Sequence, residues 1–273
     1  MGRRWLVYPY HLWMLLFTII PLMLIVFYAF TDTSTMQFTL KHVQQAASPM
    51  YLGVLGHSVC LAGLATLICL VLGYPMAMIL VKTPVKYRNM MVMLVVIPMW
   101  MNFLLRTYSW MALLERKGIV NTILAWFNLP TISILYTDYA VMLGMVYNFL
   151  PFMILPIYSV LMKMDKSLLE AAADLGADAW TSFRKVTFPL SLPGVYSGIL
   201  MVFMPAVTTF VISRLLGGGQ YMLIGNIIEQ QFLYIGNWGF GSAVSVLMLV
   251  IILLSMAFLS RYDREGDGGG MFF

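Results

Sequence analysis

Six long apolar runs, separated by polar segments, constrain this sequence more than any other feature. Each run is long enough for a helix to cross the hydrocarbon core of a membrane, which takes about 20 residues. A backbone in lipid must satisfy its own hydrogen bonds, and a helix does so within one segment. We therefore expect an all-α integral membrane protein with six transmembrane helices, at residues 12–30, 52–81, 90–111, 140–162, 194–212 and 240–259.

The composition supports a membrane location and argues against other classes. Charged residues make up 10% of the chain and the mean hydropathy is +0.87, whereas soluble proteins have about 25% charged residues. No basic stripe or soluble module suggests nucleic-acid binding. The first apolar run could be a cleaved signal peptide, but it is longer than a usual signal core and no small-x-small cleavage site follows it. We therefore expect a retained span.

The distribution of cations predicts the orientation. Six spans place both termini on one side, and that side carries eleven Lys and Arg residues against five on the other. The positive-inside rule makes the richer side cytoplasmic. Its cations are Arg3, Arg4, Lys82, Lys86, Arg88, Lys163, Lys166, Arg184, Lys185, Arg261 and Arg264. The outer five are Lys41, Arg106, Arg116, Lys117 and Arg214.

The segment 170–194 is polar although it lies between two apolar runs. Residues 168–173 have high helix propensity, and Gly176 offers a position without Cβ where a helix can end and turn. A second short helix is expected over 177–186, with Trp180 and Phe183 on one side because they are three residues apart. We expect Pro189 and Pro193 to end the segment.

This segment resembles the EAA loop of permease subunits of bacterial ABC importers. The family pattern is Glu-Ala-Ala, three residues, a glycine and a later hydrophobic residue with proline; here these are residues 170–172, Gly176 and residues 188–189. The resemblance implies short cytoplasmic coupling helices, in a loop of residues 163–188, that bind a groove on an ATPase. The alternative is an amphipathic helix lying on the membrane surface. The residues assigned to ATPase coupling are Glu170, Ala171, Ala172, Asp174, Gly176 and Ala177.

The resemblance covers nearly the whole chain and is greatest to the first permease subunit of the spermidine/putrescine importer. It is carried by residues 62–77, 97–110, 150–177 and 215–233. It implies the type I permease fold, a second homologous permease, two ATP-binding cassette ATPase subunits and an extracytoplasmic polyamine-binding protein. The complex would lie in the lipid bilayer of the bacterial cytoplasmic membrane. A permease for another small solute is the alternative, and a secondary carrier that acts alone is a weaker one.

Several absences agree with a transport subunit that is not an enzyme. The glycines at 217–219 are not followed by the lysine of a phosphate-binding loop, so we expect ATP and Mg to bind the partner ATPase and no cofactor to bind this chain. No carboxylate lies in the middle of a span, which argues against an ion-coupled carrier. The sequence shows no Ser/His/Asp or metal-binding constellation.

A path for a polyamine should offer carboxylates, aromatic faces and amide oxygens. Glu229 is the best single candidate. Each of the others has a second interpretation: the aromatic residues as interfacial anchors, Asn102 and Asn148 as groups that hydrogen-bond between helices, and Asp138 as a helix cap. The candidates are Trp100, Asn102, Tyr108, Trp110, Asp138, Tyr147, Asn148, Tyr221, Asn226 and Glu229.

Three further expectations concern the rest of the chain. We divide it into an N-terminal segment with the first helix (1–51), the transmembrane domain (52–260) and a disordered, glycine-rich cytoplasmic tail (261–273). Cys60 and Cys69 are expected to be small buried apolar residues that do not pair. Arg106 lies about 27 Å from Arg88 along a continuous helix, so we expect it to reach the outer interface or to pair with a carboxylate of the path.

Overall fold

Helices make up most of the computed structural model, which describes residues 8–32, 35–219 and 221–263, the side chains of 258–263 excepted. Within these ranges no residue belongs to a named strand, and one isolated bridge pairs Thr31 with Phe38. The expectation of an all-α membrane protein is confirmed.

Five helical segments are long and apolar enough to cross a membrane. A sixth crossing results if α5 and α6 form one span, although the chain bends by 93° between them. The five segments are Tyr8–Ala29 (α1, Tyr8–Met14; η2, Leu15–Ile19; α2, Ile20–Ala29), Pro49–Lys82 (α4), Asp138–Lys163 (α8), Ala179–Thr208 (α10, Ala179–Ser182; η3, Phe183–Thr187; α11, Phe188–Thr208) and Trp238–Asp263 (α14). The bent pair is α5 (Val85–Trp100) and α6 (Phe103–Leu114), followed by α7 (Ile119–Trp126).

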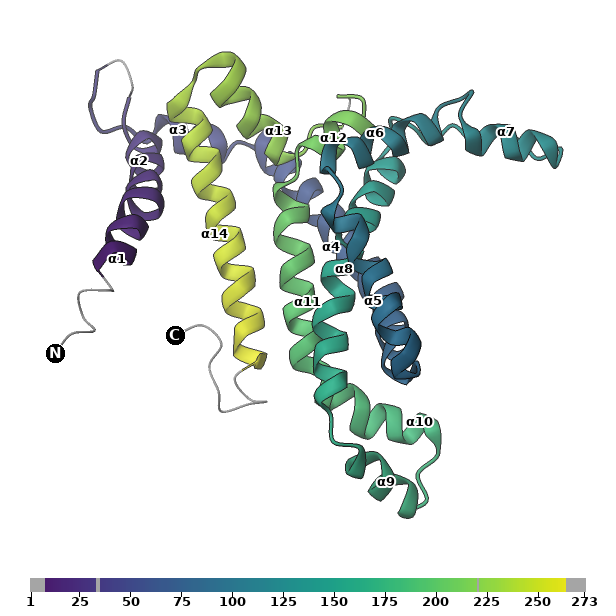
Figure 1. The fold of residues 1–273 in the computed structure, drawn as a ribbon. Coiled ribbons are helices and arrows are strands. Elements are labelled where there is room, and N and C mark those ends of the chain that lie inside the picture. Colours follow the sequence, from purple (N-terminus) through teal and green to yellow (C-terminus); the bar gives the residue numbers. More distant parts are fainter. Residues whose placement is uncertain (1–7, 33–34, 220, 264–273) are drawn as a thin grey trace.

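The direction of the chain shows that the bent pair makes the sixth crossing. Helices α4 and α8 run parallel, because His57 near the start of α4 contacts Asp138 at the start of α8, and Gly73 lies against Met153 farther along both helices. After α4 the chain must return to the end where α8 begins. The α5–α6 pair is the connection that makes this return (Figure 1).

The third predicted span, 90–111, is interrupted near Pro98 and at Asn102, as the sequence indicates, whereas Arg106 lies within a helix. Helix α5 ends at Trp100, two residues after Pro98, and the side chain of Asn102 accepts hydrogen bonds from the first backbone N–H groups of α6. An asparagine at this position begins a new helix. The estimate of 27 Å between Arg88 and Arg106, which assumed one continuous helix, therefore does not hold.

The expectation that Pro189 and Pro193 end the coupling segment is also wrong, because one helix continues from Ala179 to Thr208. The π-helical turn η3 ends at Thr187, two residues before Pro189, and changes the hydrogen-bond register there. Because of this shift in register, the absence of a backbone N–H in Pro189 does not break the helix. The fifth span starts earlier and ends earlier than the predicted range 194–212, and a short helix, α12 (Val211–Leu216), follows it.

The two ends of the bundle differ in structure. One end carries α3 (Lys41–Ala46), α6, α7, α12, α13 (Ile224–Glu229) and the π-helix η4 (Gln230–Ile235) (Figure 1). Helices α9 (Lys166–Asp174) and α10 project from the opposite end, toward which the Tyr8 end of α1 and the far end of α14 also point (Figure 1). The polar connections expected at 115–138 and 214–238 thus contain short helices.

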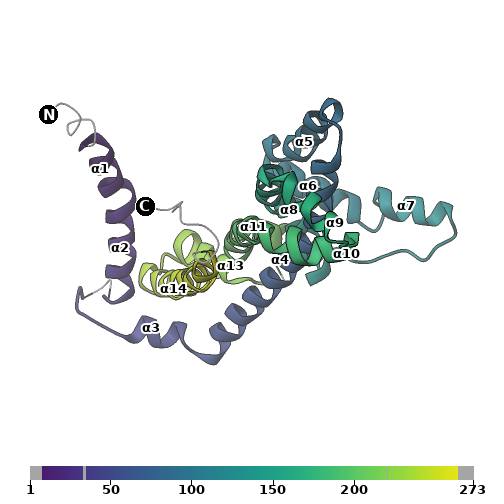
Figure 2. The same cartoon turned by 90° about the horizontal axis from the view of Figure 1, so that it is seen from below.

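Helices α4, α8 and α11 pack against one another and form the core, while α1 and α2 stand at one edge of the molecule, where α2 contacts α14 (Figure 2). Close approach in the core depends on small residues. At Gly194 of α11, an added Cβ would lie 2.9 Å from the carbonyl oxygen of Pro156 and 3.0 Å from the Cα of Ile157 in α8, so a larger residue would push these helices apart.

Two expectations outside the core have different outcomes. Both cysteines are free and Cys69 is buried, as expected, but Cys60 is exposed, so the expectation that it is buried is wrong. Helix α14 extends to Asp263, so the first residues of the expected disordered tail are helical. Residues 264–273 lie outside the described residues, and the division into domains stays a prediction.

Candidate coupling site and translocation path

Helix α9 begins at a carboxylate cap. Oδ1 of Asp165 accepts a hydrogen bond from the backbone N–H of Ser167 at 2.9 Å, and this bond lowers the pKa of Asp165 below its ordinary value. The cap satisfies a donor that the first turn of a helix otherwise leaves unpaired. Glu170, Ala171 and Ala172 lie in the middle of this helix, and Asp174 is its last residue.

The turn between α9 and α10 is centred on Gly176, as the sequence predicts. Its φ of +79° is in the left-handed region, which residues with a Cβ rarely adopt. The N–H of Ala177 donates to the carbonyl of Ala172 at 3.0 Å, and the N–H of Gly176 donates to that of Ala173 at 2.9 Å. These bonds satisfy the last carbonyls of α9 and fix the direction in which the chain leaves it.

Helix α10 begins at a second carboxylate cap and carries an aromatic pair. Oδ1 of Asp178 accepts from the N–H of Thr181 at 3.2 Å, and the hydrogen bonds with Thr181 lower the pKa of Asp178. The rings of Trp180 and Phe183 stack with their centroids 5.6 Å apart, which confirms that they share one side of the helix.

An aromatic junction joins α10 to two spans, and the sequence pattern did not reveal it. The ring of Phe183 meets the ring of Tyr74 in α4 edge-on at 5.8 Å, and Phe188 at the start of α11 lies within 6.1 Å of both. The hydroxyl groups of Tyr74 and Ser191 are 2.7 Å apart. The clue available in the sequence was a tyrosine close to the end of an otherwise apolar run.

The outward faces of α9 and α10 are apolar and uncovered. Leu175 is 88% exposed and Trp180 is 66% exposed, and Leu168 is also exposed. Figure 1 shows that α9 projects beyond the ends of the spans, so it does not lie along the surface of the hydrocarbon core. Large apolar side chains that are exposed on a projecting loop typically mark a contact with another protein.

The amide candidates for the path mostly serve the fold. Asn102 caps α6, so its expected bond between helices is wrong. The side chain of Asn226 bonds to Ser213, Leu223 and Phe210 and joins α12 to α13. Asn148 donates to the carbonyl of Gly144 in its own helix at 2.8 Å, and its buried Oδ1 has no hydrogen-bond partner within the described chain.

Both carboxylate candidates already contact a basic side chain. Oδ2 of Asp138 is 3.2 Å from Nε2 of His57, so Asp138 contacts α4 and is not the helix cap, a position held by Thr137. Oε1 of Glu229 accepts from Arg214 at 2.9 Å, and its side chain is only 12% exposed.

The aromatic candidates are in different places. Trp100 at the end of α5 and Tyr108 in α6 are exposed, and Tyr221 before α13 is half-buried. The rings of Trp110 and Tyr147 meet at 5.2 Å and join α6 to α8. The ten candidate residues for the path therefore do not converge on one point of this chain.

Arg106 does not behave as expected. It is 7% exposed, and its Nε and Nη1 have no hydrogen-bond partner within the described chain. Its guanidinium lies 5.9 Å from the ring centroid of Phe103. Neither of the two ion pairs among the described residues includes it, so the predicted pairing with a carboxylate does not occur within this part of the chain.

The described residues contain no group of three or more His, Cys, Asp or Glu side chains that could hold a metal ion. The described part of the chain forms a helical bundle with an apolar pair of short helices at one end.

Comparisons with known proteins match this geometry. Residues 69–265 match the family model described as binding-protein-dependent transport system inner membrane component. The chain is 41% identical over 259 residues to the spermidine/putrescine transport system permease protein PotB of Escherichia coli strain K12, covering 92% of this chain and 94% of that protein. It is also 41% identical to the PotB protein of Haemophilus influenzae, covering 92% and 91%.

The fold is similar to that of a solved importer. A bacterial alginate ABC transporter, in complex with an alginate pentasaccharide-bound periplasmic protein, superposes with a TM-score of 0.82 at 18% identity, and the match covers 98% of this chain and 97% of that one. At this identity the likeness concerns the fold alone, which is that of the ABC importer permeases.

Proposed function

The chain belongs to the family of binding-protein-dependent transport system inner membrane components, and we propose that it is a permease subunit of an ATP-driven importer of polyamines. The observation that carries the substrate class is the identity with two spermidine/putrescine permeases along nearly the whole chain. The observation that supports coupling to an ATPase is the apolar pair α9–α10 at the end of the bundle.

We place α9, α10 and both termini in the cytoplasm, because the predicted excess of cations is on that side. There the exposed faces of α9 and α10 bind an ATPase subunit, which carries ATP and Mg. The complete importer contains two such ATPases, a second homologous permease and an external polyamine-binding protein. This chain forms part of the translocation path. Its exposed faces on α9 and α10 contact the ATPase and move with it.

The aromatic junction provides the route for that movement. A displacement of α10 moves Phe183, which contacts Tyr74 of α4 and Phe188 of α11. Since α4, α8 and α11 pack closely, these spans respond together. The ATPase can therefore change the opening of the path without contacting any group within the membrane.

Glu229 and Asp138 are the side chains that we propose for cation recognition at the outer end. An ammonium group of a polyamine would replace Arg214 beside Glu229 or His57 beside Asp138. Trp100, Tyr108 and Tyr221 offer aromatic faces to a cation on the outer side. Of the remaining candidates, Asn102 caps α6 and Asn226 joins α12 to α13, whereas Asn148 donates only within α8.

A substitution tests the role of Glu229. Glu229→Gln keeps the size of the side chain and removes its charge, so we expect spermidine uptake to fall about tenfold, corresponding to about 1.4 kcal/mol, while assembly is unchanged. Glu115→Gln is the control, because Glu115 is exposed at the same end of the bundle. Equal uptake by the Glu229→Gln variant and the parent would remove Glu229 from the path.

The proposed function as a whole is tested by reconstitution. Proteoliposomes with this chain, its partner permease, the ATPase and the binding protein should accumulate labelled spermidine only when ATP is present at the ATPase side. Accumulation without ATP, or by this chain alone, would show a carrier of another class. Uptake of an unrelated solute with no uptake of spermidine would contradict the polyamine assignment.

A further inference from the structure

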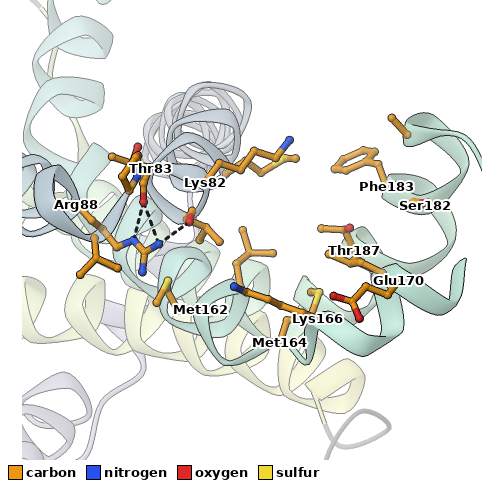
Figure 3. A pocket seen from close by; sticks show the side chains of 17 residues that line it. Lys82, Thr83, Arg88, Met162, Met164, Lys166, Glu170, Ser182, Phe183 and Thr187 are labelled. Atoms are coloured by element: carbon orange, nitrogen blue, oxygen red, sulfur yellow. Dashed lines mark hydrogen bonds between the residues drawn. The ribbon is translucent and has the colours of Figure 1, made fainter. Parts of the chain in front are cut away.

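A cavity of about 750 Å³ lies between the coupling helices and the ends of two spans (Figure 3). Its walls come from the end of α4, the start of α5, the end of α8, and the helices α9, α10 and η3. Since α4 ends at Lys82 and α8 ends at Lys163, the cavity lies where the apolar spans stop. This is the depth at which the headgroups of the adjacent leaflet lie.

Positive charge predominates in this cavity. Lys82, Arg88 and Lys166 line it, and Glu170 is the single acidic residue in its lining. None of these four belongs to either of the two ion pairs within the described parts of the chain. In Figure 3 the ammonium group of Lys166 extends away from the carboxylate of Glu170. The cavity therefore holds cationic side chains that no carboxylate of the described chain neutralises at close range.

The guanidinium of Arg88 is held in place by the protein. Its Nη2 donates to the carbonyls of Val81 at 3.0 Å and Thr83 at 2.9 Å, and its Nε also donates to Thr83 at 3.1 Å (Figure 3). These bonds orient the group toward the cavity wall without removing its charge. A guanidinium fixed in this way is already organised to bind an oxyanion.

Most of the remaining lining is apolar, although the hydroxyl side chains of Thr83, Ser182 and Thr187 also belong to it. At the ends of α4 and α8 the apolar lining consists of Met78, Val81, Leu161, Met162 and Met164. A soluble anion would leave these side chains without a partner. An amphiphile with an anionic head and an apolar body would satisfy both the cations and the methionines.

We propose that this cavity binds the phosphate headgroup of an anionic lipid from the leaflet on the α9 side. Basic pockets between transmembrane helices at this depth bind such headgroups, and each basic residue near the surface adds about 1 kcal/mol. The lipid lies between the α4–α5 turn and the coupling helices and stabilises their relative position. Binding itself requires only the membrane location of the chain, whereas its effect on ATPase coupling rests on the proposed function.

The first experiment measures binding. The assembled importer is placed in nanodiscs that contain phosphatidylcholine with or without phosphatidylglycerol, and the retained lipid is identified by native mass spectrometry. The double variant Lys82→Gln with Lys166→Gln should retain phosphatidylglycerol about 30-fold more weakly, as expected for the loss of two such cations. The control is Lys86→Gln, which removes a cation from the first turn of α5, close to Lys82 in the chain but outside the cavity lining; it should bind like the parent.

The proposal is overturned if the double variant retains phosphatidylglycerol as well as the parent, or if the control loses it equally. It is also overturned if inorganic phosphate binds the parent in phosphatidylcholine and displaces the retained lipid at submillimolar concentration, because the ligand would then be a soluble phosphate.

A second measurement separates this proposal from the proposed function. In the same nanodiscs, phosphatidylglycerol should increase spermidine-stimulated ATPase activity of the parent but not of the double variant. One outcome is that spermidine does not stimulate the ATPase activity of the parent in either lipid mixture, while the parent and the variants retain phosphatidylglycerol as predicted. In that case the proposed function fails and the lipid site stands. If ATPase is stimulated equally in both proteins in both lipids, the regulatory role is overturned.

Discussion

Tyr74 and Ser191 show how two hydroxyl groups define the junction between the coupling helix and the spans. Ser191 has one hydroxyl proton, and its Oγ donates to the carbonyl of Phe188 at 2.8 Å. Tyr74 must therefore be the donor of the 2.7 Å hydrogen bond between the two hydroxyls. This bond fixes the position of the Tyr74 ring, against which Phe183 lies.

The substitution Tyr74→Phe tests this junction. It retains the aromatic contacts and removes one buried hydrogen bond, which contributes about 1 kcal/mol. We expect the ATPase activity per molecule of spermidine transported to rise several-fold, with normal insertion in the membrane. Tyr74→Leu should have a larger effect, because it also removes the ring. Unchanged coupling in the leucine variant would mean that the junction does not transmit movement.

Gly176 gives a second test at the same scale. An added Cβ would find nothing within 4 Å, so the cost of a substitution is the strain of the left-handed backbone, about 1–2 kcal/mol, and not a clash. Gly176→Val should therefore change the turn and lower ATP-driven uptake, while Gly176→Asn should retain most of it because asparagine tolerates this conformation. If both variants transport like the parent, the direction of this turn is unimportant for coupling.

Individual residues differ in how well their positions could be predicted. The roles of Gly176 and of the pair Trp180 and Phe183 depend on local geometry and on helical spacing, and the structure agrees with both. The partners of Asp138 and Glu229 lie 81 and 15 residues away in the chain. No local pattern encodes contacts at such separations, so their pairing could not be predicted.

At the scale of helices, the length of the apolar runs predicted five of the six membrane crossings. Proline and asparagine residues determine where helices continue or begin. Pro189 does not interrupt its helix, whereas Asn102 begins a new one. A proline is compatible with a helix when the preceding turn changes its hydrogen-bond register. An asparagine within an apolar run can instead satisfy the first N–H groups of a new helix. The sequence alone indicates an interruption at both residues and does not distinguish these outcomes.

The cap at Asn102 can be tested directly. Asn102→Ala removes hydrogen bonds to the N–H groups of Leu104 and Leu105 and should destabilise the protein by about 1 kcal/mol. The midpoint of thermal unfolding in detergent should therefore fall by a few degrees. Asn102→Asp keeps an acceptor at this position and should restore the midpoint. If the alanine variant unfolds at the parental temperature, the cap does not stabilise the bend between α5 and α6.

For the whole molecule, the central feature is the separation between its two ends. Candidate groups for substrate recognition lie at the end with α6, α12 and α13, and the apolar coupling surface lies at the other end on α9 and α10 (Figure 1). The sequence predicted this separation from charge distribution and the spacing of the spans. It could not predict the aromatic junction or the cavity beside it, because both are formed by segments that meet only after the chain has folded.

The most direct test of this account is a photo-crosslink in the assembled importer. A photoreactive amino acid at position 175 or 180, where Leu175 and Trp180 are exposed, should crosslink to the ATPase subunit. The same probe at position 123 in α7, where Ile123 is also exposed, should give no ATPase crosslink. Crosslinking to the ATPase from position 123, or none from positions 175 and 180 in an active complex, would contradict the account.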